Sequence, residues 1–95
     1  MTSLTLLVLS LAAQDPTAAY DRFSECIRGE LERATQVASS REAFARYLDT
    51  RCKAEEATAR KAMVASMNGN PDAEAFHQMA VDTERAVTVD MYPGD

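Results

Sequence analysis

Two cysteines placed symmetrically about a helix-start signal constrain the fold of this chain more than any other feature. Ser39 followed by Glu42 has the spacing of a capping box, which predicts that one helix ends and another begins there. Cys26 and Cys52 each lie 13 residues from Ser39. In an antiparallel helical hairpin that turns at Ser39, the two cysteines therefore face each other, and helices packed about 8–10 Å apart can bring their Cα atoms within disulfide reach. We predict a Cys26–Cys52 disulfide.

Other uses of the two cysteines are a redox pair, a metal site, or two buried free thiols. A thioredoxin-type redox motif is Cys-x-x-Cys, whereas 25 residues separate these cysteines. A structural zinc site takes four ligands, and His77 is the only histidine in the chain. No metal or cofactor is therefore expected, and free thiols remain the main alternative to the disulfide.

Capping signals and apolar periodicity predict three helices and a tail. Asp15 followed by Pro16 is a typical helix start, and Gly69 followed by Asn70 and Pro71 indicates a stop and a new start. Apolar residues recur at three- and four-residue steps after each start. The predicted fold is all-α, an antiparallel helical hairpin plus a third helix in a small three-helix bundle, with helices at about 16–38, 40–68 and 71–87 and a tail at 88–95. Apolar and polar residues alternate over 87–92, so an extended course across the bundle is one interpretation of the tail.

The same periodicity predicts which side chains face the core. Gly29, in the middle of the first helix, is expected to allow close approach of a neighbour, and the alternative is that it has no specific role there. The inward positions of the first helix are Tyr20, Phe23, Ile27, Leu31, Ala34 and Ala38. Those of the second helix are Phe44, Tyr47, Leu48, Cys52, Ala59, Met63 and Met67. Those of the third helix are Ala73, Phe76, Met79, Ala80, Thr83 and Val87.

The first residues predict export. Leu4–Ala13 reads LTLLVLSLAA, which is too short for a bilayer span of about 20 residues but suits the apolar region of a secretory signal. The predicted division is a signal peptide at 1–13 and a helical domain at 14–95. Residues 1–3 carry no Lys or Arg and the segment is short, so a buried first helix or strand is the alternative. Export to the periplasm or the exterior would also let a disulfide persist.

Charge is distributed unevenly along the chain, whose formal net charge is −5. Residues 15–69 carry nine acids and nine bases, whereas residues 70–95 carry six acids and one base, Arg85. Nucleic acids and anionic membranes bind basic surfaces, so neither is an expected partner. A basic protein is the kind of partner that the acidic excess favours.

No group of residues in the sequence predicts catalysis, and the chain is not expected to be an enzyme. Glu74-x-x-His77 has the spacing of a di-iron ligand pair, but that site needs a second such pair. His77 is therefore expected to be exposed. Glu55 and Glu56 are expected to pair on the surface with bases four and five residues later, Arg60 and Lys61.

The methionines of the second and third helices have two interpretations. Packing between these helices is the first, and an adaptable binding surface is the alternative. The residues concerned are Met63, Met67, Met79 and Met91.

The nine residues from Phe44 to Cys52, FARYLDTRC, resemble part of the LprI-type lysozyme-inhibitor domain of bacterial envelopes. That family has an aromatic residue, a second aromatic three residues later, then Arg-Asp and a cysteine. Phe44, Tyr47, Asp49 and Cys52 match, with Phe44 in place of the usual Trp and Leu48 in place of the Arg. The family's further upstream cysteine and its Leu-Asn-x-x-Tyr segment have no counterpart here.

The chain as a whole also resembles small uncharacterised exported bacterial helical proteins with one disulfide. This resemblance implies a fold and a compartment. The predicted function is that of a small exported periplasmic protein that serves as a structural or protein-interaction module. The alternative, implied by the local resemblance, is a lysozyme-inhibitor-like binder of a basic envelope hydrolase.

Overall fold

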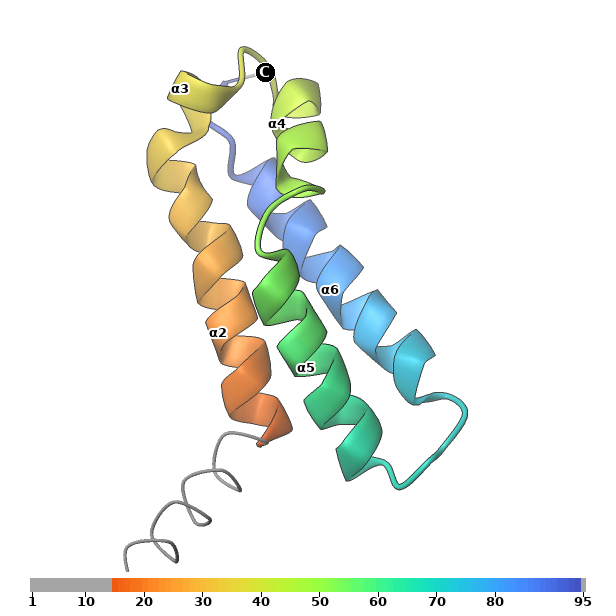
Figure 1. Cartoon of the computed structure of the whole chain (residues 1–95). Helices are drawn as coiled ribbons and strands as arrows, with labels where there is room; N and C mark the ends of the chain where they lie inside the picture. The colour runs from red at the N-terminus through yellow and green to blue at the C-terminus, as the bar shows by residue number, and fades with distance from the viewer. Residues whose placement is uncertain (1–14, 95) are drawn as a thin grey trace, which may run out of the picture.

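A computed structural model describes residues 15–94, which form an all-α bundle (Figure 1). The predicted signal peptide at 1–13 lies outside the described residues. Within 15–94, no helix is both long and apolar enough to cross a bilayer. The helical elements are, in chain order, α2 (Pro16–Gly29), a 3-10 segment (Glu30–Arg33), α3 (Ala34–Val37), α4 (Arg41–Leu48), α5 (Lys53–Ser66) and α6 (Ala73–Asp90).

The bundle is built on the predicted hairpin, with α6 as the third rod. Figure 1 shows α2 and α5 side by side with opposite directions, α6 packed along α5, and α4 beside α3 at the end of the bundle that holds the chain's C-terminus. Aromatic and branched side chains of α2, α4 and α6 fill the main core. Its buried members are Phe23, Ile27, Ala34, Ala38, Phe44, Leu48, Val81 and Tyr92.

The Cys26–Cys52 disulfide is present and joins α2 to the start of α5, with 6.0 Å between the two Cα atoms. Between the disulfide and the start of α2, the helices α2 and α5 meet through small side chains. Ala19, Ala59 and Ala62 form a separate buried cluster there. Alanine lets two helices approach closely without leaving a gap. The predicted cross-linked hairpin is therefore confirmed.

The side chain of Asp15 caps α2 as the sequence indicates, whereas α6 begins two residues later than predicted. The Asp15 carboxylate accepts a hydrogen bond from the amide of Thr17 at 3.0 Å, ahead of α2. The Asn70 side chain accepts one from the amide of Asp72 at 2.8 Å within the turn, but it is not the predicted cap, because Asp72 is the N-cap of α6 and no side chain caps that helix. Gly69 adopts the left-handed conformation, with φ +78°, in the turn between α5 and α6.

The turn of the hairpin differs in detail from the prediction. Ser40 is the N-cap of α4, and its hydroxyl accepts the amide hydrogen of Ala43 at 3.1 Å. The predicted capping box of Ser39 with Glu42 is wrong by one residue. Both serines offer the same chemistry, and the backbone of Ser40 is extended, at φ −152°, as an N-cap requires.

The predicted single helix at 40–68 is wrong, because residues 49–52 separate α4 from α5. Cys52 lies in the left-handed region with φ +60°, which a non-glycine residue seldom adopts. The side chain of Arg85 on α6 donates to the carbonyls of Leu48 and Arg51, and the Leu48 carbonyl also accepts the amide hydrogen of Arg51 in a tight turn rather than in a continuous α-helix. The disulfide and Arg85 together hold this break.

The predicted end of the third helix at about residue 87 is wrong, because α6 continues to Asp90 and residues 88–90 are helical rather than extended. Thr88 is buried, and its hydroxyl donates to the carbonyl of Glu84 at 2.9 Å, which is compatible with a helix. Tyr92 then turns back into the core, where its hydroxyl donates to the Ala38 carbonyl at 2.8 Å. The alternating sequence therefore belongs to the end of a helix and the turn after it, with Thr88 and Tyr92 packed and Val87, Asp90 and Met91 exposed.

Replacing Gly29 with alanine is expected to raise the free energy of unfolding by about 0.5–1 kcal/mol. Gly29 has φ −61°, and a Cβ added there meets no heavy atom within 4 Å, so the predicted close approach of a neighbour is wrong. Urea denaturation of Gly29→Ala measures the gain. Gly69→Ala is the opposing control and should be destabilising, because its φ of +78° suits glycine alone. A loss of stability in Gly29→Ala would contradict this account.

Candidate protein-binding surface

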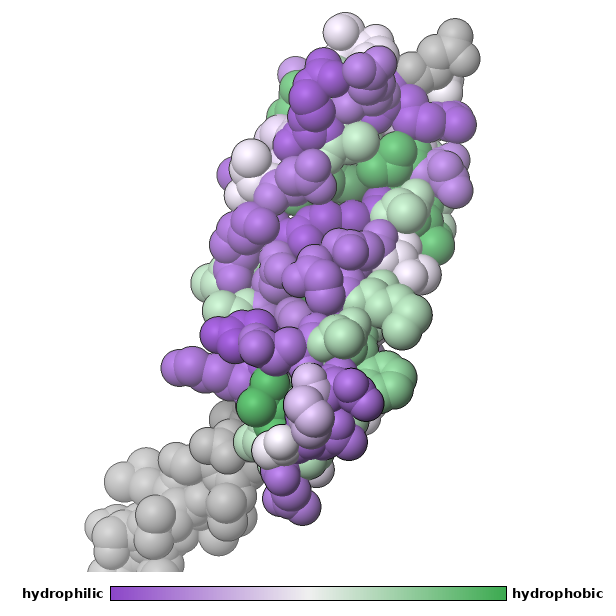
Figure 2. Space-filling model, turned by 90° about the vertical axis from the view of Figure 1, so that its right-hand side faces the viewer, coloured by the Kyte–Doolittle hydropathy of each residue, from purple (hydrophilic) through white to green (hydrophobic). Residues whose placement is uncertain are grey.

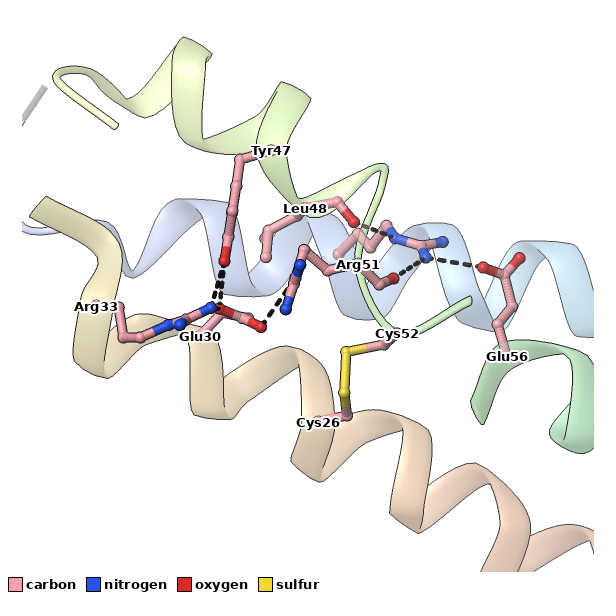
Figure 3. The surroundings of a disulfide bond; sticks show 9 residues. Cys26, Glu30, Arg33, Tyr47, Leu48, Arg51, Cys52 and Glu56 are labelled. Carbon is pink, nitrogen blue, oxygen red and sulfur yellow. Dashed lines mark hydrogen bonds and ion pairs between the residues drawn. A yellow bond between two sulfur atoms is a disulfide. The ribbon is translucent and has the colours of Figure 1, made fainter. Parts of the chain in front are cut away.

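A network of charged side chains lies beside the disulfide and joins the two arms of the hairpin (Figure 3). The buried Glu30 carboxylate accepts hydrogen bonds from Arg33 at 2.8 Å, from the Tyr47 hydroxyl at 2.7 Å and from Arg51 at 3.2 Å. Burial alone would raise the pKa of Glu30, but these three donors outweigh it and hold that pKa below its usual value. Glu30 thus stays charged and ties the 3-10 segment to α4 and the break.

A second network centres on Arg85 of α6, which is buried. Its guanidinium donates to the carbonyls of Leu48 at 3.1 Å and Arg51 at 3.1 Å and pairs with Glu56 at 2.7 Å. It also lies over the ring of Phe23, with 5.2 Å between the guanidinium carbon and the ring centroid. Glu56 is therefore not the surface partner of Arg60 that the sequence predicts, since Arg60 pairs with Glu74.

A third contact explains how an acid enters the core side of α6. The buried Glu84 carboxylate accepts hydrogen bonds from Arg28 at 2.6 Å and from the Tyr20 hydroxyl at 3.2 Å, both on α2. Burial, with the Glu84 charge and hydrogen bond next, raises the pKa of Tyr20. The sequence did not predict these three networks.

One signal in the sequence could have indicated them. Arg85 is the single base of residues 70–95 and directly follows Glu84.

The three networks are structural, because their donors and acceptors satisfy one another. Around the disulfide, atoms of Cys26, Cys52 and Glu55 lie within 4.8 Å of one another, a spacing that suits a metal. The two sulfur atoms are bonded to each other, however, and a metal needs free thiolates. The chemistry of this cluster is that of a cross-link.

His77 is buried, at 3% exposure, so the prediction that it is exposed is wrong. Its Nε2 atom has no hydrogen-bond partner among the described residues. Burial lowers the pKa of His77, while the facing charges act in opposite senses, Glu56 and Glu74 raising it and Arg60 lowering it. The neutral imidazole is therefore the form that the fold favours.

We expect the fold to lose stability as the pH falls below about 6.5. Because the pKa of His77 is lower in the folded state, the unfolded chain binds the proton more tightly. The stability that His77 contributes is complete above its unfolded pKa and is lost as the pH falls through its folded pKa. Glu30 and Glu56, whose pKa values are lowered from the usual 4.5, add a second loss at more acidic pH.

Urea midpoints measured across pH check both losses. His77→Leu keeps the volume but cannot titrate, so it should remove the loss that begins near pH 6.5 and retain the loss at lower pH. If His77→Leu and the parent protein show the same pH profile, the account of His77 is wrong.

The outward face of α6 carries the apolar residues that were predicted to face the core. Phe76, Met79 and Val87 are 51%, 58% and 37% exposed, and Met91, just after the helix, is 47% exposed. Phe76, Met79 and Val87 lie on one face and are called the α6 stripe below. The prediction is correct for Ala73 but wrong for Phe76, Met79 and Val87, because the rest of the core side of α6 is taken by His77, Val81, Glu84, Arg85 and Thr88.

A shallow groove of about 330 Å³ adjoins the α6 stripe where α2, α5 and α6 meet. Ala80, one turn after Phe76 on α6, forms one wall. The residues that line the groove are Pro16, Thr17, Tyr20, Met63 and Ala80. In Figure 2, most of the face in view is hydrophilic, and hydrophobic side chains gather along one edge. Stripe and groove together form an apolar surface bordered by polar side chains.

Acidic side chains lie at both ends of the α6 stripe. From Asp72 through the stripe to Asp90, positions on this face follow one another at steps of three and four residues. Asp82 flanks the same face and accepts a hydrogen bond from Gln78 at 2.8 Å. None of the three aspartates forms an ion pair within residues 15–94. The surface is therefore apolar at its centre and negative at its ends.

No protein-family model, curated protein or solved structure matches the chain. The residues that carry the local resemblance to lysozyme-inhibitor domains, 44–52, form the second half of α4 and the break before α5. Phe44 is in the core, Tyr47 bonds to Glu30, and Cys52 forms the disulfide. That stretch is engaged within the fold, whereas the apolar surface lies on α6.

Proposed function

We propose that the chain is a small exported periplasmic protein that acts as a protein-interaction module. The observation that carries the proposal is the α6 stripe, because a helix of a small bundle normally turns such residues inward. The disulfide and the three charged networks stabilise the interior without using the residues of the α6 stripe. The stripe is therefore free to bind a partner.

Export is supported by the disulfide, because such bonds persist mainly in oxidising compartments. The apolar sequence of residues 4–13 supports it independently. The intact mass of the protein recovered from the periplasm is expected to lack the leader and to rise by about two daltons on reduction. Recovery of the uncleaved chain with free thiols from the cytoplasm would contradict export.

The interaction role is tested by cross-linking the protein to its neighbours in an envelope extract. The variant Phe76→Ser with Met79→Ser should lose at least one partner that the parent protein captures. Val37→Ser is the matched control, because Val37 is also a partly exposed apolar residue but lies on α3. Identical capture by all three proteins would contradict an interaction role for α6.

A lysozyme-inhibitor-like binder of a basic envelope hydrolase is the second candidate. It is favoured by the acids at the ends of the α6 stripe and by the resemblance at residues 44–52. A cell-wall lysis assay with a basic lysozyme tests it directly. Inhibition at near-equimolar ratio that weakens with added salt is expected, and full lysis in the presence of a molar excess would contradict it.

A further inference from the structure

The charges around the α6 stripe indicate which kind of surface can cover it. Asp72 and Asp90 lie at its two ends, and Asp82 flanks it. The only base on α6, Arg85, points inward and is engaged by Glu56 and two carbonyls. An occupant of this face therefore meets apolar side chains in the centre and three carboxylates that have no cation of their own within the described residues.

A second copy of the chain is a poor occupant. If two α6 helices packed in antiparallel fashion about their midpoints, Asp72 of one copy would approach Asp90 of the other. In a parallel arrangement, each aspartate would approach its own counterpart. Both arrangements bring like charges together at the ends of a short apolar contact, which opposes association.

We propose that the α6 stripe and the adjoining groove bind a basic amphipathic helix of a partner protein. This inference rests on the proposed interaction role and specifies the partner's chemistry. Apolar side chains at i, i+3, i+4 and i+7 of that helix pack on the stripe and insert into the groove beside Tyr20 and Met63. Lysine or arginine residues beside its apolar face pair with Asp72, Asp82 and Asp90, which adds orientation and a faster association rate.

Three synthetic peptides serve as probes, each about as long as the 18 residues of α6. The first has leucines at helical spacing flanked by lysines. The second keeps the leucines and replaces the lysines with glutamates. The third keeps the lysines and replaces the leucines with serines. Binding to the full-length oxidised protein is measured by calorimetry, and the site is located from amide NMR shifts.

The first peptide is expected to bind and to shift amides over residues 76–91, and the other two to bind at least about tenfold more weakly. Phe76→Ser with Met79→Ser should weaken binding of the first peptide by about tenfold or more. Val37→Ser should leave it unchanged. Phe76, Met79 and Val37 are all exposed, so we expect both variants to keep the fold of the parent protein.

The charge effect has its own matched control. Asp72→Asn with Asp90→Asn should weaken binding of the first peptide several-fold and reduce its salt dependence. Glu25→Gln with Glu32→Gln changes the net charge equally on exposed positions of α2 and the 3-10 segment and should have little effect. Equal weakening by both pairs would mean that net charge alone drives binding, which overturns the proposal.

Other occupants give distinct results, and each of them overturns the proposal. A second copy would appear as a dimer in sedimentation that Met79→Ser dissolves. Coverage by the chain's own N-terminal segment would prevent all three peptides from binding. If capture of a natural partner requires the α6 stripe but the three peptides bind with the same affinity, the proposed function stands and the basic-helix inference fails. If no partner depends on the stripe, the proposed function fails first.

Discussion

Replacing Cys26 and Cys52 with alanine is expected to lower the free energy of unfolding by about 3.5 kcal/mol. The disulfide closes a loop with a sequence separation of 26 residues and holds two Cα atoms 6.0 Å apart. In the unfolded chain this closure removes conformations, so the folded state gains relative stability. For a domain of this size, that gain is a large part of the total. Urea denaturation of the variant and of the oxidised parent measures the difference.

The parent protein unfolded in the presence of a dithiol reductant is the natural control. It should lose about as much stability as the double alanine variant, because the same constraint is removed. A loss below about 1 kcal/mol in both would show that the disulfide contributes far less than chain entropy implies.

A companion variant tests whether the break between α4 and α5 survives without the disulfide. Cys52 has φ +60°, which glycine adopts without the cost of about 1–2 kcal/mol that alanine incurs. If the break persists, Cys26→Ala with Cys52→Gly is more stable than the double alanine variant. If α4 and α5 merge into one helix, the order reverses, because glycine costs about 1 kcal/mol inside a helix. We expect the first result, since Arg85 still holds the break.

Arg85→Met is expected to lower the free energy of unfolding by about 3 kcal/mol. The substitution removes the donor of the Arg51 carbonyl, takes one of the two donors from the Leu48 carbonyl, and leaves the Glu56 carboxylate without its buried partner. It also removes the cation from the ring of Phe23. Chemical denaturation measures the loss, and amide hydrogen exchange should show its largest increase at residues 48–56.

Two further variants make the Arg85 result interpretable. Arg85→Met with Glu56→Gln should be more stable than Arg85→Met alone, because no unpaired charge is left. Arg46→Met is the exposed control; its ion pair with Glu42 is solvent-accessible, so the change should stay within about 0.5 kcal/mol. If Arg85→Met behaves like Arg46→Met, the network is not what holds the break.

Local signals in the sequence determined the hairpin. Asp15, Pro16 and Gly69 act on their immediate neighbours, so helix starts and stops could be predicted without knowledge of the rest of the fold. Phe23 and Ile27 fall in the core because their neighbours at helical spacing are also apolar. The positions of the two cysteines about the turn then fixed which faces of α2 and α5 meet.

From the sequence, the candidate surface appeared only as the alternative interpretation of methionines such as Met79, because the rotation of α6 depends on contacts between elements. By hydrophobicity alone, Phe76 and Met79 belong inside and Glu84 and Arg85 outside. The structure reverses this because Arg28 and Tyr20 satisfy Glu84, while Glu56 and two carbonyls satisfy Arg85. A buried charge is acceptable only where partners remove its desolvation cost.

The sequence by itself determined the approximate starts of α2, α4 and α6, the direction of the hairpin and the pairing of the cysteines, since each follows from neighbours along the chain or from simple mirror spacing. Only the tertiary structure decided the break at residues 49–52, the burial of His77 and the exposure of the α6 stripe. These three features depend on side chains from separate helices that come together only in the folded bundle. Periodicity ranks residues by their own polarity and contains no information about such distant partners.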